Sequence, residues 1–495
     1  MKYFLTLIQL WVGFLSICAS YPKANIWIIP SVESPQVYRN YAQTSKVHLE
    51  MARGEVEHIQ LVFPSKVNEE YRFTFDRYLK GIQISARELK KMNGYYDALV
   101  PFKNQLKCTD TLTAVWITVQ CPSRVPVGKY HQTIKIEGSK HFTIQLDYNV
   151  HHTTIPLKSS IPITVGVENR CMTEGLNDKE ADKERQRWVD FVLSYRMTPV
   201  FGTQITPERW QYEHSFSPWA WNDKRSIRLL NDRRYSCYML PFFTLSENEL
   251  ASLLCNIQKK GKLKESLFYI WDEPAYMEDY EQIKRKVNII RKYASDARIL
   301  TTFFCGPRNG PRKGDLYAVF DYLKHHIHVA TISLAPCKGN EEEVQHIRYK
   351  VPEGIDWWSY VCWQPGGNEP NFLLQMKGIQ QRAVMWRTWK NGSQGFLYWN
   401  CNIYHKRNPF TYITDMPHGD GILIYPGDIL GCKGPIASAR LERWRDGAEE
   451  MELLRLVEKN YSKEKADTLL NIVYSSPLSF IEKAHNIPFF RKELL

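Results

Sequence analysis

The chain has 495 residues, more than one ordinary hydrophobic core holds, so two or three domains are expected. Its formal net charge is +12, but the basic residues are scattered and do not interleave with aromatic residues along a stripe. This distribution excludes a nucleic-acid surface, indicates a solvated basic exterior and leaves an acidic polysaccharide open as a substrate. The 15 tryptophans and 28 tyrosines supply ring faces on which sugars pack, although large cores use them too.

The N-terminal segment has the layout of an export signal. Lys2 supplies a positive charge, a mostly apolar run covers residues 4–17, and two small residues follow it. The run is shorter than the about 20 residues that a membrane helix needs, and no later segment reaches that length. We therefore expect a signal peptide over 1–20 and an exported protein, periplasmic or extracellular, without a membrane span. Cys18 loosely resembles a lipoprotein cysteine and is a candidate lipid anchor, although Ile17 stands where a small residue is usual.

The eleven cysteines lie singly along the chain. None of them forms a Cys-x-x-Cys pair or a zinc-type spacing with histidine. The close histidines His325, His326 and His328 are better explained by a solvated loop than by a metal. We therefore expect neither a metal nor a cofactor, and the pattern assigns no disulfide.

The first part of the chain predicts β-structure only. Short segments that alternate or run apolar are separated by glycine, proline, serine and lysine, which is typical of strands joined by turns. The segments are 56–63, 114–119, 131–136 and 142–150. They predict a β-sandwich domain over 21–155, with residues 153–160, around Pro156, as the linker.

After the linker, short apolar runs alternate with amphipathic helical stretches. The runs are 163–167, 199–202, 237–243, 267–271, 299–304, 328–334, 355–361 and 395–399. Eight repeats of strand and helix predict an α/β fold, a (β/α)₈ TIM-type barrel over 156–460. A doubly wound sheet is the alternative, but no glycine-rich phosphate loop follows any run.

Helix signals support this division. Helical stretches are expected at 179–196, 247–260 and 278–293, and Ser246 with Glu249 three residues later predicts a capping box. Two further helices, at 435–459 and 463–474, are expected to pack on the barrel or cap it. Residues 461–495 therefore form a predicted C-terminal helical extension.

Two adjacent carboxylates follow the fourth apolar run. The run Leu267–Trp271 delivers Asp272 and Glu273, and Pro274 ends the strand. Active sites of these barrels lie at the carboxyl ends of the strands, and glycosidases commonly use two carboxylates. We therefore predict that Asp272 and Glu273 are catalytic; a solvated loop is the alternative.

The usual partner of such a pair is missing. In the large barrel clan whose fourth strand ends Asn-Glu-Pro, the second carboxylate follows the seventh strand. Here the seventh run, 357–364, carries no glutamate at its end, and Glu369 lies farther along a loop. Two acids from one strand end favour a substrate-assisted mechanism. Asp272 would orient the 2-acetamido group of the sugar, and Glu273, its pKa raised by that neighbour, would be the acid and then the base.

The C-terminal half carries an ordered set of motifs. They are Trp357–Tyr360, Pro370–Phe372, Arg382–Lys390, Gly395–Trp399, Gly419–Gly427 and Pro435–Gly447. Together they resemble the catalytic family known as domain of unknown function 4091, which includes glycoside hydrolase family 123, and the upstream sandwich is similar to that family's usual partner domain. The resemblance implies β-N-acetylgalactosaminidase activity through an Asp-Glu pair, here Asp272 and Glu273. One departure is Glu450-Met451, where an Asp followed by an aromatic residue is expected.

Four residues at the ends of the seventh and eighth strands are candidate substrate contacts. They are Trp358, Tyr360, Trp399 and Asn400. Their rings and amide suit a sugar subsite, with Tyr360 favoured by strand alternation, whereas barrel packing is the alternative. Asp420, after Gly419, is expected to form a turn.

The resulting hypothesis is a glycoside hydrolase that cleaves terminal β-linked N-acetylgalactosamine from a glycan. Two alternatives remain open at this point. One is a retaining glycosidase of different sugar specificity, and the other is a noncatalytic glycan-binding protein on the same scaffold.

Overall fold

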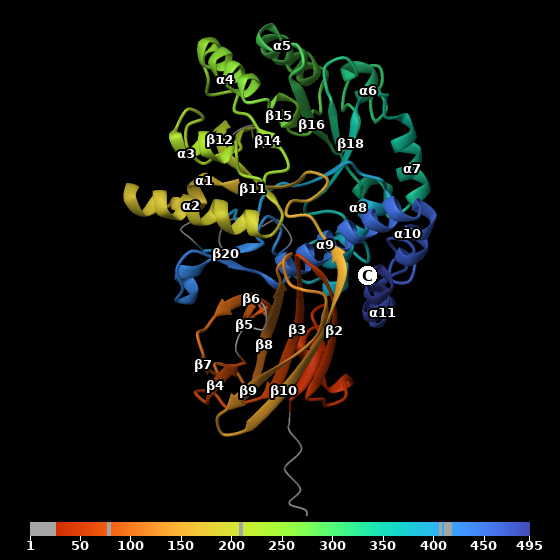
Figure 1. The fold of residues 1–495 in the computed structure, drawn as a ribbon. Coiled ribbons are helices and arrows are strands. Elements are labelled where there is room, and N and C mark those ends of the chain that lie inside the picture. The colour runs from red at the N-terminus through yellow and green to blue at the C-terminus, as the bar shows by residue number, and fades with distance from the viewer. Residues whose placement is uncertain (1–25, 77–80, 207–210, 405–407, 410–417) are drawn as a thin grey trace, which may run out of the picture.

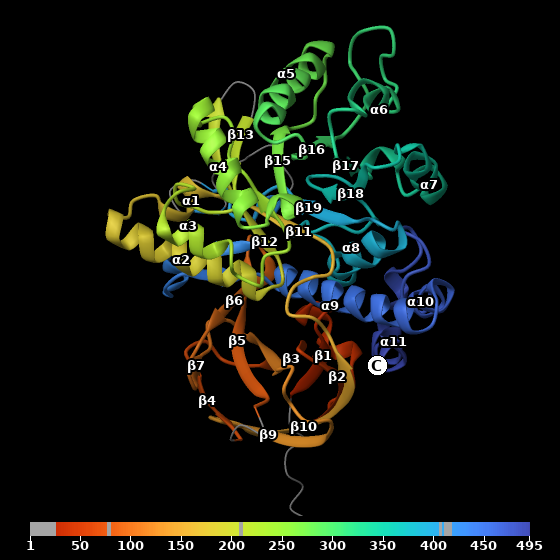
Figure 2. The ribbon, with the colours of Figure 1, turned by 45° about the horizontal axis from the view of Figure 1, so that its top comes forward.

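The computed structural model describes residues 26–76, 81–206, 211–404, 408–409 and 418–495. The expected signal peptide, including Cys18, lies outside the described residues. Strands from the N-terminal part form one end of the molecule, and a mixed α/β part forms the other (Figures 1 and 2). Within the described ranges, no helix is both long enough and apolar enough to cross a membrane.

The N-terminal part consists of two five-stranded sheets that share one hydrophobic core. In spatial order the first sheet holds β1 (Trp27–Pro30), β3 (Glu55–Pro64), β8 (Leu112–Cys121), β5 (Gln83–Met92) and β6 (Tyr95–Pro101). The second holds β2 (Lys46–Arg53), β10 (His141–Thr154), β9 (Gly128–Glu137), β4 (Glu70–Phe75) and β7 (Gln105–Lys107). Alternation creates the buried face: Ile134 and Ile136 of β9 are fully buried, whereas Lys135 between them is exposed. This arrangement agrees with the predicted sandwich.

Each of the eight apolar runs after residue 160 overlaps a strand, and wherever two of these eight strands pair with each other, they are parallel. In chain order they are β11 (Ile163–Glu168), β12 (Thr198–Thr206), β14 (Tyr238–Met239), β15 (Ser266–Trp271), β16 (Arg298–Phe303), β17 (Val329–Ser333), β18 (Asp356–Val361) and β19 (Gly395–Tyr398). Their inward side chains, such as Leu267, Leu300, Val329 and Leu397, form one buried cluster.

The sheet departs from a regular (β/α)₈ barrel at one place. β13 (Gln211–Ser215) runs antiparallel to β12 and makes a nine-stranded sheet that ends at β13 and β14. The Phe216 N–H, just past β13, donates to the Met239 carbonyl of β14 at 2.6 Å. The result is an almost closed, mostly parallel barrel-like sheet in which an inserted strand stands between β12 and β14.

Helices follow the strands and cover the outside of the sheet (Figure 2). They are α1 (Asn169–Thr173), α2 (Asp178–Ser194), α3 (Lys224–Leu229), α4 (Glu247–Lys259), α5 (Met277–Tyr293), α6 (Ala318–Leu323), α7 (Glu341–Lys350) and α8 (Gly378–Lys390). The predicted capping box at Ser246 and Glu249 is confirmed: Ser246 accepts the Glu249 N–H, and the Glu249 carboxylate accepts the Ser246 N–H. Both bonds satisfy amides that the first turn of a helix leaves free.

The C-terminal part contains β20 (Ile424–Pro426), β21 (Pro435–Ala437), α9 (Ala439–Asn460), α10 (Lys463–Leu470) and α11 (Ile487–Leu494). The helix predicted from residue 435 begins later than expected. Residues 435–437 pair with β20 instead, and the Ser438 side chain caps the helix by accepting the Leu441 N–H. The predicted domain limits themselves stay predictions.

α9 joins the two parts of the molecule, lying between the sandwich and the barrel (Figure 1). His58 of β3 contacts Asp446 at 2.9 Å and Glu442 at 3.1 Å, all three side chains being buried. Burial alone would lower the pKa of His58, but the two carboxylates outweigh it and raise the pKa. The last motif of the sequence, Pro435–Gly447, therefore fixes the interface between domains.

Candidate active site

A bulge in β15 turns two side chains of one strand toward the barrel interior. The register against β16 shifts between Tyr269 and Trp271. Ile270 and Trp271 both pack in the outer core beneath the helices, whereas Tyr269 and Asp272 line a pocket inside the mouth. Strict alternation would have put Tyr269 and Asp272 on opposite faces. The bulge thus allows the Tyr269 ring to lie beneath the carboxylate that ends its own strand.

Asp272 is held through one of its two oxygens. The Tyr269 hydroxyl donates to Asp272 Oδ1 at 2.6 Å, and the Thr302 hydroxyl donates to the same atom at 2.7 Å. Tyr269 and Thr302 are buried, so their hydroxyl groups are fixed in position. The carboxylate is therefore oriented from below, and Oδ1 is the atom that carries both bonds.

Glu273 has a strained backbone and separate partners. Its φ is +46°, a left-handed conformation that side chains other than glycine rarely adopt and that clusters at functional sites. Its N–H donates to Thr302 Oγ1 at 3.0 Å, and its Oε1 accepts a hydrogen bond from the Tyr360 hydroxyl. Thr302 thus links the two acids: it donates to Asp272 and accepts from the backbone of Glu273.

The electrostatics of the mouth favour a protonated Glu273. Asp272 and Glu273 are both exposed to solvent at the end of β15, but protein atoms lie close around the Glu273 carboxyl group. That partial burial and the charge of Asp272 raise the pKa of Glu273 to about 7, although the Tyr360 hydrogen bond and the charge of Arg308 act in the opposite direction. A carboxyl group in this range can hold its proton near neutral pH and release it during a reaction.

The pocket beside Asp272 is built from the strands on the β11–β19 side of the barrel. Its lining includes His214 of β13, Tyr398 and Trp399 of the β19 end, and Asn400. The His214 ring stacks on the Tyr269 ring with centroids 4.3 Å apart and planes 20° apart. Burial lowers the pKa of His214 to about 4, so the ring is neutral at neutral pH. A neutral imidazole beside aromatic faces can exchange hydrogen bonds with a sugar hydroxyl.

Residues 183–457 match the family described as glycoside hydrolase 123, catalytic domain. The chain belongs to glycoside hydrolase family 123. Family membership assigns glycoside hydrolysis to the protein.

A solved family 123 structure has a similar fold. It is the glycoside hydrolase from Clostridium perfringens studied for glycolipid glycan hydrolysis, with 13% sequence identity and a TM-score of 0.66 over 95% of this chain and 97% of that one. A family 2 β-galacturonidase from Eisenbergiella tayi, bound to galacturonate, gives 8% identity and a TM-score of only 0.35 over 80% of this chain and 90% of that one. No curated protein matches the chain. At these identities the similarity concerns the fold alone.

The structure brings three of the four predicted substrate contacts of this family 123 chain to the mouth. Tyr360 reaches Glu273, while Trp399 and Asn400 line the pocket beside Asp272. Trp358 lies deeper: its indole packs inside the barrel against the first residue of β19, Gly395. Trp358 is not among the residues that line this pocket, and its role as a substrate contact stays a prediction.

Glu369 and Asp420 both have structural partners. Glu369 is buried and accepts a hydrogen bond from Arg387 of α8 at 2.8 Å, in an ion pair that Glu341 shares. Glu369 is therefore held in this ion pair, in the loop that follows β18. Asp420 accepts hydrogen bonds from the Trp399 indole at 3.1 Å and the Tyr398 hydroxyl at 3.3 Å, and burial raises its pKa to about 6. Asp420 holds a pocket wall in place, a role beyond the turn that the sequence predicts.

Sequence reasoning missed several residues of the site. Tyr269 and Thr302 are ordinary strand residues whose hydroxyl groups gain their role from the β15 bulge. His214 lies on the inserted strand β13, which the periodicity of the sequence does not predict. Glu168, the last residue of β11, follows the lining residue Val167 but does not itself line the pocket; it caps α1 by accepting the Arg170 N–H, and burial raises its pKa to about 7. Its place at a strand end was the available signal.

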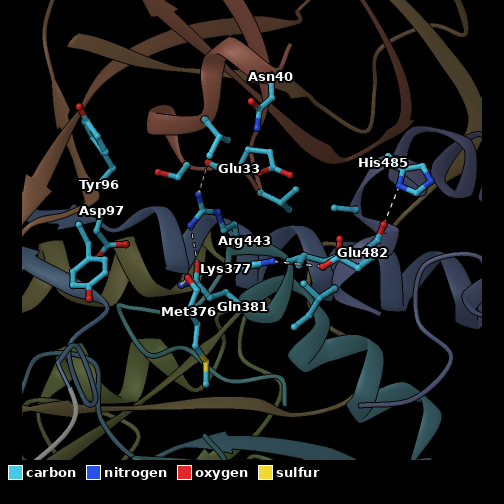
Figure 3. Close-up of a pocket in the computed structure, with 18 of the residues that line it drawn as sticks. Glu33, Asn40, Tyr96, Asp97, Met376, Lys377, Gln381, Arg443, Glu482 and His485 are labelled. Atoms are coloured by element: carbon cyan, nitrogen blue, oxygen red, sulfur yellow. Dashed lines mark hydrogen bonds and ion pairs between the residues drawn. The ribbon is translucent and has the colours of Figure 1, made fainter. Parts of the chain in front are cut away.

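A larger cavity lies elsewhere, between the sandwich and the loop before α8 (Figure 3). Its charged lining residues already have partners: Lys377 pairs with Glu482 at 3.7 Å, and Arg443 donates to Gln381 at 2.8 Å. It contains neither Asp272 nor Glu273. The candidate active site is therefore the barrel mouth, where Asp272 and Glu273 lie. In the part of the chain that the structure describes, no group of three or more histidine, cysteine or acidic residues could hold a metal ion.

Proposed function

We propose that this family 123 enzyme cleaves terminal β-linked N-acetylgalactosamine from a glycan by a substrate-assisted, retaining mechanism. The observation that carries the proposal is that the adjacent carboxyl groups of Asp272 and Glu273 are held by different residues. Asp272 is oriented by two hydroxyl donors, whereas Glu273 is bound by Tyr360 and has a raised pKa. Neighbouring carboxyl groups with different environments suit different roles.

In the first step, the acetamido oxygen of the bound sugar attacks the anomeric carbon. Glu273 gives its proton to the departing glycosidic oxygen, and the bond from that oxygen to the anomeric carbon breaks. The product is an oxazolinium-type ring, and its positive nitrogen is balanced by the Asp272 carboxylate. Because the attacking group belongs to the substrate, it is already held at close range.

In the second step, Glu273, now ionised, removes a proton from water. The water oxygen attacks the anomeric carbon, the ring opens, and the acetamido group is restored. Two inversions at one carbon give net retention. Glu273 is protonated again at the end, so one residue serves as acid and base.

The residues that line the pocket beside Asp272 suit the sugar that this mechanism requires. Trp399 and His214 offer ring surfaces and a neutral nitrogen, and Asn400 lies with them at the end of β19. These groups suit a sugar with hydroxyl and amide substituents and no charge. We place the N-acetylgalactosamine ring over the opening of this pocket, beside Asp272, because the pocket itself, at about 50 Å³, takes a substituent and not the whole ring.

The direct test compares two aryl glycosides that differ only at carbon 2. The enzyme should release nitrophenol from the β-N-acetylgalactosaminide and not from the β-galactoside, which lacks the nucleophile. A similar rate with the galactoside would overturn the substrate-assisted assignment. Absence of cleavage by a correctly folded enzyme in a screen of aryl N-acetylhexosaminides would favour a glycan-binding role.

We also propose that the protein acts outside the cytoplasm. The support is the layout of residues 1–20, with one lysine before an apolar run. Fractionation of cells that express the full chain, with a Cys18→Ser variant, tests both export and the lipid anchor. Recovery of the uncleaved chain from the cytoplasm would contradict export.

A further inference from the structure

Asp272 and Glu273 divide the mouth of the barrel into two sides. The pocket beside Asp272 is lined from β11, β12, β13 and β19, together with Tyr269 of β15. Glu273 instead contacts Tyr360 of β18, and β16 and β17 lie between β15 and β18 in the sheet. Glu273, the proposed acid, therefore faces the rim above β16–β18, on the side away from the pocket beside Asp272.

An aromatic pair stands on that rim. Phe304 follows β16 and lies two residues after Thr302, while Trp363 follows β18 and lies three residues after Tyr360. The two rings are nearly parallel, with centroids 6.4 Å apart and planes 15° apart. Trp363 is 45% exposed, although large aromatic side chains in this protein are mostly buried.

The loop that carries Trp363 is anchored from below. Asn371 is fully buried, and its side-chain amide donates to the carbonyls of Cys362 and Pro365, each at 2.8 Å. The Cys362 N–H in turn donates to the Gln364 carbonyl at 3.0 Å. An exposed tryptophan on so constrained a backbone is preorganised, which lowers the entropy cost of binding a ligand.

The loop that carries Phe304 is fixed to the loop of the catalytic pair. The Arg308 N–H donates to the Ala275 carbonyl at 2.6 Å, and the Met277 N–H donates to Asn309 Oδ1 at 2.8 Å. Both aromatic rings therefore hold a defined position relative to Glu273. The exposed face of the Trp363 indole can pack against an occupant that has an apolar face of its own.

We propose that Trp363, backed by Phe304, is the platform on which the leaving-group sugar of the glycan packs. The inference rests on the proposed function, because it takes Glu273 as the acid that protonates the glycosidic oxygen. With N-acetylgalactosamine beside Asp272, the group beyond that oxygen extends toward the β16–β18 rim. A sugar ring presents C–H bonds on one face, which pack on an indole, and keeps its hydroxyl groups in water.

The test measures kcat/KM for the full-length enzyme with three substrates. The first is a disaccharide of N-acetylgalactosamine β-linked to galactose, the second is N-acetylgalactosaminyl fluoride, and the third is the octyl β-glycoside. Trp363→Ala should lower kcat/KM for the disaccharide about tenfold. The same substitution should leave kcat/KM for N-acetylgalactosaminyl fluoride unchanged, because the fluoride leaving group does not reach the platform. Trp363→Phe, which keeps a ring, should recover most of the loss.

Tyr461→Ala is the matched control, because Tyr461 is an exposed aromatic residue at the end of α9, 77% exposed. It should leave all three values unchanged, and melting curves should show every variant folded. If Trp363→Ala lowers kcat/KM equally for the disaccharide and the fluoride, or lowers neither, Trp363 is not the platform. In that case, activity of the wild type on these substrates would still support the proposed function. An equal loss on the octyl glycoside would show a general apolar surface and overturn the sugar assignment. Inactivity of the wild type on all three would overturn both proposals.

Discussion

The hydroxyl of Tyr360 donates a hydrogen bond to the Glu273 carboxylate across the barrel mouth. Their strands, β18 and β15, are separated in the sheet by β16 and β17, so the bond spans the interior. It stabilises the ionised form of Glu273, whereas burial and Asp272 favour the protonated form. The balance holds the pKa of Glu273 at about 7.

Tyr360→Phe should move the alkaline limb of the pH profile to higher pH. Glu273 must carry its proton to act as an acid, so kcat/KM falls as pH rises through its pKa. Removing the hydroxyl removes an influence that lowers this pKa, and the fall should therefore begin later. The measurement is kcat/KM against pH for both enzymes with an N-acetylgalactosaminide. A limb that stays in place or moves to lower pH contradicts the assigned role of Tyr360.

Glu273→Gln should separate substrates by their leaving groups. General acid catalysis is typically worth about 10²–10⁴ in rate, and it matters most when the leaving group is a poor one. Cleavage of an alkyl glycoside should be lost, while that of a dinitrophenyl glycoside should be partly spared and should lose its alkaline limb. Equal losses on the two substrates would exclude Glu273 as the acid.

The sequence was sufficient to predict those candidate site residues whose position follows from strand order. Asp272 and Glu273 come directly after a continuous apolar run, and Tyr360 follows from alternation along β18. Alternation placed Trp358 on the same inward face, but it does not give depth along the barrel, and Trp358 packs at the level of Gly395. Depth depends on how the strands are staggered, which one sequence does not show.

Two irregularities account for what the sequence left out. The inserted strand β13 brings His214 to the pocket, and the bulge in β15 brings Tyr269 under Asp272. Both are set by tertiary contacts and not by a local period. The resemblance found from ordered motifs was the stronger guide to function, and some of its residues, including Asn371, act by holding loops.

Glu369→Gln should reduce stability and leave the chemistry intact. The charge of Arg387 is buried, and Glu369 is one of its two acidic partners. Removing one carboxylate should cost about 2 kcal/mol, less than the loss of a whole buried pair, because Glu341 remains. Denaturant unfolding gives the stability, and kcat below the melting range gives the chemistry. The matched control is Glu353→Gln at an exposed position. A collapse of kcat in a folded Glu369→Gln enzyme would revive the two-carboxylate alternative.

Asp272→Asn should lower kcat strongly while substrate still binds. Asparagine can keep the bonds from Tyr269 and Thr302, but it carries no charge to balance the oxazolinium nitrogen. A thiazoline analogue of the cyclised intermediate should inhibit the wild type far more tightly than substrate binds, by a factor of at least about 10². The variant should lose most of that tight binding. Unchanged inhibition of Asp272→Asn would exclude the stabilising role.

The mechanism is tested most directly by fluorinating the acetamido group of an aryl N-acetylgalactosaminide. Each added fluorine weakens the acetamido oxygen as a nucleophile and changes the size of the substrate little. If that oxygen attacks the anomeric carbon, kcat should fall steeply from the acetyl to the difluoroacetyl and trifluoroacetyl substrates. A kcat independent of fluorination, together with a glycosyl adduct trapped on a side-chain carboxylate, would contradict the account.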